Sequence, residues 1–321
     1  MAEPPGYGVI ASELLSLDRV EAALPELAAQ QLSVSLEWPT DDLDNPQRWA
    51  LVRHAEQLGI TIIPWLLLPE DQGYWPCSSN ADLFVASAQR LMQRWAEEGL
   101  SPTALLVDME MHIDRERDFS ALVHALDNSG VIEFLRAGID REQFRDATEQ
   151  YRELAIKAHT LGWKVHLTTW SQVLEDYGDG DDDLRQAFGI PVDHIPWDGV
   201  FIQAFRTATN PQASSFYVYD YALRARSIFG RRAGIVLGVT QPGMISRTGY
   251  ASPADLRADV DAAYAAGLRR EQIGLISLRG ILNRPPTAAW FVRPHIFLVP
   301  PLPDAATAFI HTVAGFWDLL L

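Results

Sequence analysis

Residues 81–112, with the sequence ADLFVASAQRLMQRWAEEGLSPTALLVDMEMH, contain the unit that decides the fold. Apolar residues three and four positions apart predict a helix over Ala81–Glu98, and the apolar run Ala104–His112 predicts a buried strand after it. Gly99 stands between them, where a glycine suits the left-handed cap of a helix before the chain turns into a strand. This stretch therefore predicts one helix followed by one strand of a parallel sheet.

The same alternation extends outward from this unit to both ends of the chain. The predicted strands are Tyr7–Ala11, Ser33–Trp38, Thr61–Leu68, Ala104–His112, Lys164–Trp170, Val200–Phe205, Gly234–Thr240 and Ile273–Arg279. The predicted helices are Asp18–Gln30, Pro46–Leu58, Ala81–Glu98, Arg141–Leu161, Asp182–Phe188, Tyr217–Phe229, Pro253–Ala266 and Asp304–Leu320. This alternation predicts an α/β fold of the (β/α)8 TIM barrel type. Since no Pro/Ser-rich linker divides the chain, we expect a single barrel domain over residues 1–321, with insertions near 113–140 and 280–303.

Composition and charge limit the kinds of partner and the cell compartments that we expect for this protein. A formal net charge of −16 disfavours binding to phosphate backbones, so we expect no nucleic-acid partner. No apolar run reaches the ~20 residues that span a bilayer, so we expect no transmembrane segment. A single cysteine, Cys77, suits a cytoplasmic protein, and a secreted protein whose signal peptide has been removed fits as well. The glycine motifs of nucleotide-binding proteins are absent, which disfavours phosphate chemistry. We expect no cofactor, and the oligomeric state stays open.

Ionisable side chains mark the end of the fourth predicted strand. Because side chains alternate along a strand, Asp108, Glu110 and His112 share one face. Burying two carboxylates inside a barrel costs several kcal/mol per ion unless other groups compensate. We interpret Asp108 and Glu110 as catalytic residues at the barrel mouth; the alternative is an ion-paired stripe with Arg206 or Arg279 as counterion.

Polar and aromatic residues at other strand ends predict a carbohydrate substrate. Aromatic faces beside carboxylates and amides suit sugars, which present apolar C–H faces and hydroxyl edges. The Tyr74–Trp75 loop is expected to contribute as well. The candidate substrate-binding residues are Glu37, Trp38, Trp65, His166, Trp170, Gln203, Phe205, Gln241 and Arg279.

The sequence Asp108-Met109-Glu110 at the end of a fourth barrel strand resembles the final D-x-E of the chitinase-like glycoside hydrolases of family eighteen. N-acetylmuramidases of the family twenty-five lysozyme type also place a D-x-E at a strand end. The resemblance implies that Glu110 is the general acid and that Asp108 orients or stabilises the substrate, a neutral or amino-sugar glycan. Thr103 and Leu106 occupy the places of the first two acids of the longer family motif, and Phe205 stands near the place of its tyrosine.

Two other functions remain open at this point. Asp108, Glu110, His112 and His166 are ligand types that a metal-dependent sugar isomerase or lyase of barrel fold would use, although we predict no metal site. The missing motif acids favour a non-catalytic glycan-binding pseudo-hydrolase. The acidic segment 175–183 lacks the ligand spacing of a calcium loop, and we expect a solvated loop that ends in a helix cap.

Overall fold

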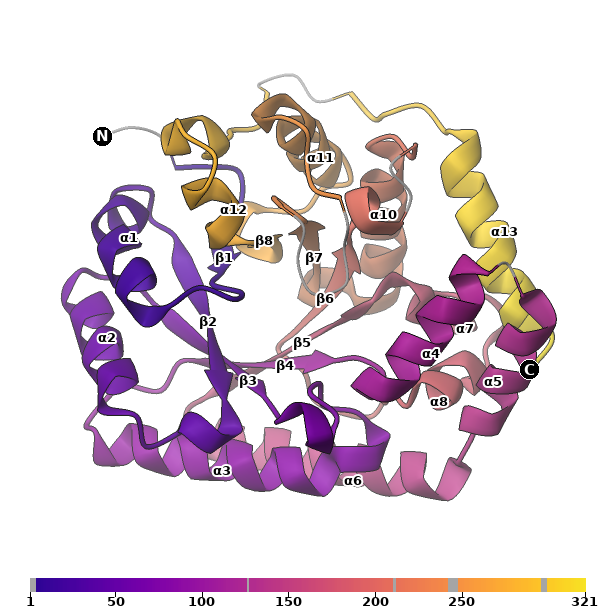
Figure 1. Ribbon diagram of the computed structural model, residues 1–321, viewed down its shortest axis with the longest axis horizontal. Coiled ribbons are helices and arrows are strands. Elements are labelled where there is room, and N and C mark those ends of the chain that lie inside the picture. Colours follow the sequence, from indigo (N-terminus) through magenta and orange to yellow (C-terminus); the bar gives the residue numbers. More distant parts are fainter. Residues whose placement is uncertain (1–3, 126, 210–211, 242–247, 296–298) are drawn as a thin grey trace. The chain divides into compact units, whose positions relative to one another are not determined.

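The computed structural model describes residues 4–125, 127–209, 212–241, 248–295 and 299–321. Eight parallel strands form a closed barrel in the order β1 to β8, which confirms the predicted (β/α)8 TIM barrel (Figure 1). The strands are β1 Val9–Ala11, β2 Ser33–Pro39, β3 Ile62–Leu67, β4 Ala104–Met109, β5 Lys164–Trp170, β6 Gly199–Ala204, β7 Ala233–Gly238 and β8 Ile273–Ile276.

Helices follow the strands as the apolar periodicity predicts (Figure 1). The helices after the first seven strands are α1 Leu17–Ala29, α2 Pro46–Gln57, α3 Ala81–Glu97, α6 Arg141–Thr160, α8 Asp183–Phe188, α10 Phe216–Phe229 and α11 Pro253–Ala265, and α13 Ala305–Leu319 lies near the C-terminus. Gly59, Gly99 and Gly162 have positive φ angles of 74°, 71° and 81°, so each takes the left-handed conformation predicted after a helix. Among the described residues, no helix combines the length and the apolarity needed to cross a membrane.

Both predicted insertions contain helices. The first contains α4 Ile113–His124 and α5 Asn128–Gly138, whereas its residue 126 lies outside the described residues. The second contains most of the short helix α12 Leu278–Leu282, and its residues 296–298 likewise lie outside the described residues. Two further short helices, α7 Asp176–Asp179 and α9 Arg206–Thr209, begin soon after β5 and β6.

The chain forms two compact units. The first unit comprises Met1–Glu37, Asn45–Pro64 and Gly199–Ala308, and it pairs β1 with β2 and β8 as well as β7 with β6 and β8. The second unit comprises Trp38–Asp44, Trp65–Asp198 and Phe309–Leu321, and in it β4 pairs with β5 over the whole length of β4. Within the second unit, the long helices α3 and α6 pack side by side (Figure 1).

The core of the second unit encloses Cys77. The side chain is 2% exposed, and the hydroxyl of Tyr151 donates a hydrogen bond to the Cys77 carbonyl at 2.9 Å. Burial raises the pKa of the thiol above its ordinary value, so the reactive thiolate form is disfavoured.

Candidate functional site

The two predicted catalytic carboxylates lie at the end of β4. Leu105 and Val107 have no exposed surface, which places their stripe between the sheet and the surrounding helices. Asp108 belongs to the opposite stripe, is 2% exposed and stands in register with Thr168 of β5. Glu110 is 5% exposed and follows the strand. The structure therefore buries both carboxyl groups, a placement that a packing role alone does not explain.

Glu110 is oriented by an aromatic neighbour. The indole Nε1 of Trp170, the last residue of β5, donates a hydrogen bond to Glu110 Oε2 at 2.8 Å. The indole stacks on Phe119, with ring centroids 6.3 Å apart, and meets Phe188 edge-on at 5.4 Å. Because these rings hold the indole from α4 and α8, its N–H group fixes the orientation of the Glu110 carboxyl group.

The strand ends earlier than the sequence predicts, so His112 has a different role. The backbone N–H of Glu110 donates to the carbonyl of Pro76 at 3.2 Å, and the ladder with β5 stops at Met109. His112 becomes the N-cap of α4, where its Nδ1 accepts the backbone N–H of Asp114 at 3.4 Å. Capping of the helix N-terminus is enough to account for a histidine at this position.

His166 lies on β5 in register with Leu106 and is half-buried. Burial lowers the pKa of its imidazole from 6.5 to about 4; Asp198 opposes the shift and Lys164 adds to it. The ring is therefore neutral at pH 7 and can donate or accept a hydrogen bond without carrying charge.

The predicted tryptophans differ in their exposure. Trp38 has no exposed surface and packs against Trp95 with ring centroids 6.1 Å apart, and Trp65 is 5% exposed. Trp75 is also buried, with the ring of Tyr74 edge-on at 4.9 Å. Of the three tryptophans predicted to bind substrate, Trp170 is the one that stays half-buried, and it is also the one that contacts Glu110.

In the first unit, Glu37 lies at the carboxyl end of β2 with its carboxylate held in place. The backbone N–H of Leu14 donates to Glu37 Oε2 at 2.6 Å. The backbone of Glu37 is fixed as well, because its N–H donates to Ser12 Oγ at 2.9 Å and its carbonyl accepts Arg48 Nη1 at 2.7 Å. Glu37 is thus an oriented acceptor next to the end of β1.

Arg279 does not end β8, as the sequence predicts, because that strand stops at Ile276. The backbone N–H of Ser277 donates to Thr240 Oγ1 at 3.1 Å, and α12 begins at Leu278. Arg279 is half-buried on this short helix, where its charge acts on the carboxyl group of Glu13. Arg206, the other counterion of the ion-pair alternative, holds the buried carboxylate of Asp259, with its Nε 3.0 Å from Oδ2.

The remaining predicted residues of the first unit lie at or beyond strand ends. Gln203 is 6% exposed on β6, and Phe205, the next residue but one, is half-buried just beyond the strand. Gln241 is half-buried after β7, and its Oε1 accepts a hydrogen bond from Asn283 Nδ2 at 3.0 Å. Asn283 in turn accepts Arg19 Nη2 at 2.8 Å, so amide and guanidinium groups form one chain of hydrogen bonds.

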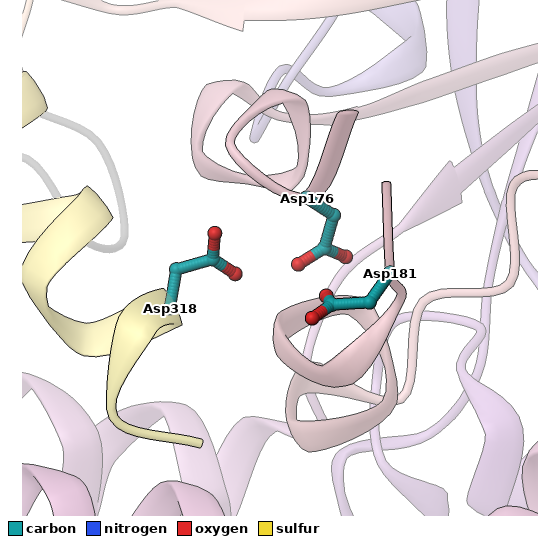
Figure 2. Close-up of side chains that lie close together, drawn as sticks. All are labelled: Asp176, Asp181 and Asp318. Carbon is teal, nitrogen blue, oxygen red and sulfur yellow. The ribbon is translucent and has the colours of Figure 1, made fainter. Parts of the chain in front are cut away.

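The acidic segment 175–183 is not wholly a solvated loop, contrary to the sequence prediction. Asp176 has no exposed surface, and its carboxylate accepts Arg185 Nε at 2.7 Å as well as the backbone N–H groups of Leu184 and Arg185. The carboxylates of Asp176, Asp181 and Asp318 approach within 4.8 Å of one another (Figure 2). They are the one close group of three possible metal ligands among the described residues, and Asp108, Glu110, His112 and His166 are outside it.

Comparisons with known proteins identify the fold. No protein-family model and no curated protein sequence matches the chain. A GH18 chitinase from Pseudoalteromonas aurantia is similar in structure, with a TM-score of 0.55 and 10% identity over 88% of this chain and 98% of that chain. The PgaB (BpsB) glycoside hydrolase domain from Bordetella bronchiseptica has a TM-score of 0.52 and 12% identity, over 89% and 98% of the two chains. A D-allulose 3-epimerase from Methylomonas sp. has a TM-score of 0.47 and 13% identity over the full length of both chains.

What the first two of these proteins share with this chain is the fold. Chitinases of family eighteen are among the structural neighbours of this chain, as the resemblance at Asp108-Met109-Glu110 led us to expect. At such identities the likeness does not extend to the reaction, which has to be argued from the side chains.

One ionisable residue near these strand ends was missed by the sequence analysis. Glu13, in the segment after β1, is half-buried, and its pKa is raised from 4.5 to about 7. Burial is the larger cause and the negative charge of Glu37 the next, while Arg279 and Ser277 oppose the shift. Its place two residues beyond the end of β1 was the available signal, because carboxyl ends of barrel strands carry active sites.

Proposed function

We propose that this protein is a glycoside hydrolase-like TIM barrel that acts on a neutral or amino-sugar glycan. Glu110 is the general acid, and Asp108 orients or stabilises the substrate. The observation that carries the proposal is the buried Glu110 carboxyl group at the end of β4, oriented by the Trp170 indole at 2.8 Å, with Asp108 on the same strand.

The chemistry of these groups suits glycoside cleavage. A glycosidic bond breaks when a carboxylic acid protonates the leaving oxygen while a second carboxylate stabilises the positive charge that develops on the sugar. Glu110 and Asp108 supply these two groups from one strand end. Trp170 adds a partly exposed aromatic ring beside the acid, which suits the C–H face of a sugar.

The other predicted residues take supporting roles in this proposal. His166, which is neutral at pH 7, and Gln203 offer hydrogen bonds to hydroxyl groups. Glu37, Gln241 and Arg279 do the same from the ends of β2, from the segment after β7 and from α12. Phe205 offers an apolar surface, whereas the packing of Trp38 and Trp65 in the core leaves them to support the strands.

The first prediction concerns turnover and is tested with a panel of aryl glycosides of neutral and N-acetylated amino sugars and with chito-oligosaccharides. We expect the wild-type protein to release product from a member of this panel. Replacing a general acid typically lowers the rate by 10²–10⁴-fold, so Glu110→Gln should lower kcat by about that factor. Asp108→Asn should impair turnover as well.

The control is Glu142→Gln, which changes an exposed carboxylate on α6. It should leave the rate unchanged, and circular dichroism should show all three variants folded. Binding of a glycan without turnover would favour the pseudo-hydrolase instead. A Glu110→Gln variant with wild-type activity would exclude Glu110 as the general acid.

A further inference from the structure

A second pair of carboxyl groups lies in the first unit, at the ends of neighbouring strands. Ala11 of β1 pairs with Ser35 of β2, and continuing this register by two residues brings Glu13 level with Glu37. Ala11 also pairs with Ile276 of β8, and Arg279 follows three residues after Ile276. Three adjacent strands therefore bring two carboxylates and one guanidinium group to the same edge of the sheet.

The turn that carries Glu13 is strained. Leu14 has a φ angle of 53°, in the left-handed region that is unfavourable for a residue with a side chain. In this conformation the Leu14 N–H points at Glu37 Oε2, 2.6 Å away. Backbone strain of this kind often accompanies functional sites, because the surrounding structure has to maintain it.

A buried hydroxyl group lies beside the pair. Ser277 is 1% exposed, and its backbone N–H and carbonyl are both bound to the hydroxyl of Thr240. Its own Oγ lowers the pKa of the Glu13 carboxyl group. Among the described residues, however, no group forms a hydrogen bond of standard geometry with this oxygen. A buried polar atom in this state is costly to maintain, and a bound ligand that donates or accepts a hydrogen bond would satisfy it.

We propose that Glu13 and Glu37 form an acid–base pair in which Glu13 gives and takes the proton. The Leu14 N–H fixes the Glu37 carboxylate by a hydrogen bond, and the negative charge of Glu37 disfavours a second charge on Glu13. Neighbouring carboxyl groups in unlike environments are a usual basis of acid–base assignments.

The pair suits a ligand with hydroxyl groups, and in this respect the inference rests on the proposed function. The groups around Glu13 include a carboxylate, a guanidinium group and a hydroxyl group, which together both donate and accept hydrogen bonds. The Glu13 carboxylate accepts the proton of an attacking water or sugar hydroxyl group as its oxygen bonds to the anomeric carbon. The glycosidic C–O bond breaks in the same step, and its leaving oxygen takes a proton from the general acid. Glu13 is then a carboxylic acid, and it returns to the carboxylate by releasing the proton to water.

The pair is tested first by following the carboxyl ¹³C resonances of glutamate-labelled protein through a pH titration. We expect one glutamate to titrate near pH 7 in the wild type and its signal to be absent in Glu13→Gln. In Glu37→Gln this signal should titrate at lower pH, because a neighbouring negative charge has been removed. The control Glu56→Gln changes an exposed glutamate on α2 and should leave the signal in place. Absence of any glutamate titrating above about pH 5.5, or its persistence in Glu13→Gln, would overturn the pair.

The role of Glu13 is tested next with the glycan panel described above. We expect wild-type kcat/KM to fall as the pH decreases below about 7, because Glu13 then becomes protonated. Glu13→Gln should reduce kcat about 100-fold or more and lose this acidic limb, whereas Glu56→Gln should retain it.

The two proposals fail in different ways. Loss of activity in Glu110→Gln together with an unchanged pH profile in Glu13→Gln would overturn the role of Glu13 alone. Full activity in Glu110→Gln would overturn the role of Glu110 alone. If the wild-type protein turns over no glycan of the panel, the proposed function and the proton transfer to Glu13 during glycan cleavage both fail.

Discussion

For two residues of this barrel, burial shifts the pKa more than the neighbouring charges do. His166 and Glu13 show the two directions of this effect. Burial disfavours the charged imidazolium of His166 and lowers its pKa, and it disfavours the charged carboxylate of Glu13 and raises its pKa. Both residues are consequently neutral, or close to neutral, over part of the physiological pH range.

The pKa of His166 predicts how the stability of the protein depends on pH. An unfolded histidine takes up a proton below about 6.5, whereas folded His166 resists protonation until about pH 4. The unfolded state thus binds more protons between these values, and the free energy of unfolding should decrease as the pH falls from 6.5 to 4. The whole difference amounts to about 3 kcal/mol at most.

Urea unfolding at pH 7, 6, 5 and 4 measures this contribution. His166→Gln should show a smaller loss of stability on acidification than the wild type. The control His54→Gln changes a histidine on α2 whose side chain is 40% exposed, and it should follow the wild type. Equal slopes for wild type and His166→Gln would show that His166 is solvated in the folded protein.

Between elements, a buried polar network lies in the first unit, around Asp259 of α11. The carboxylate has no exposed surface and accepts Arg206 Nε at 3.1 and 3.0 Å and the Tyr250 hydroxyl at 2.8 Å. Arg206 also donates to the carbonyl of Ala213 at 3.0 Å. This network joins α9, the segment before α10 and the segment before α11 to α11 itself.

Breaking this network should strongly destabilise the folded protein. Removing one partner of a buried ion pair leaves the other charge buried and uncompensated, which typically costs 3–5 kcal/mol. We therefore expect Asp259→Ala to lower the free energy of unfolding by about that amount in urea titrations. Glu149→Ala, which breaks the exposed pair with Arg152, should leave the free energy of unfolding nearly unchanged, because solvent screens the pair. A cost below about 1 kcal/mol for Asp259→Ala would contradict the structural importance of the network.

At the scale of the whole molecule, the barrel could be predicted from the sequence because its signals are local. Apolar periodicity and glycines after helices recur along the chain from one β/α repeat to the next, and these signals do not depend on long-range contacts. The strand ends were harder to predict, since they are decided by single hydrogen bonds. The bond from the Glu110 N–H to the Pro76 carbonyl ends the ladder of β4, and no pattern in the sequence indicates it.

The candidate site was predicted less completely for two physical reasons. Glu37 and Trp38 are adjacent on one strand, so their side chains point to opposite faces and cannot both reach the barrel interior. Glu13 was missed because its place near Glu37 and Arg279 depends on the register of β1 with β2 and on the pairing of β1 with β8, which closes the barrel. Asp108 and Glu110 were recognisable because ionisable residues interrupt an otherwise apolar run.

The buried position of Cys77 also predicts the reactivity of the whole chain toward thiol reagents. A side chain that is 2% exposed, with its thiolate disfavoured, should react with a maleimide dye only when the protein unfolds. Native protein should therefore show no adduct by intact mass spectrometry, and protein in urea should show one. Rapid labelling of the native protein would contradict this.

Because Cys77 does not react in the folded protein, a second cysteine can be labelled selectively without replacing it. A cysteine introduced at an exposed position, such as Ala258→Cys on α11, should accept one fluorophore while Cys77 stays unmodified. Optical probes can then be attached at chosen positions on the barrel without replacing the native cysteine, and each remains the single reporter in its molecule.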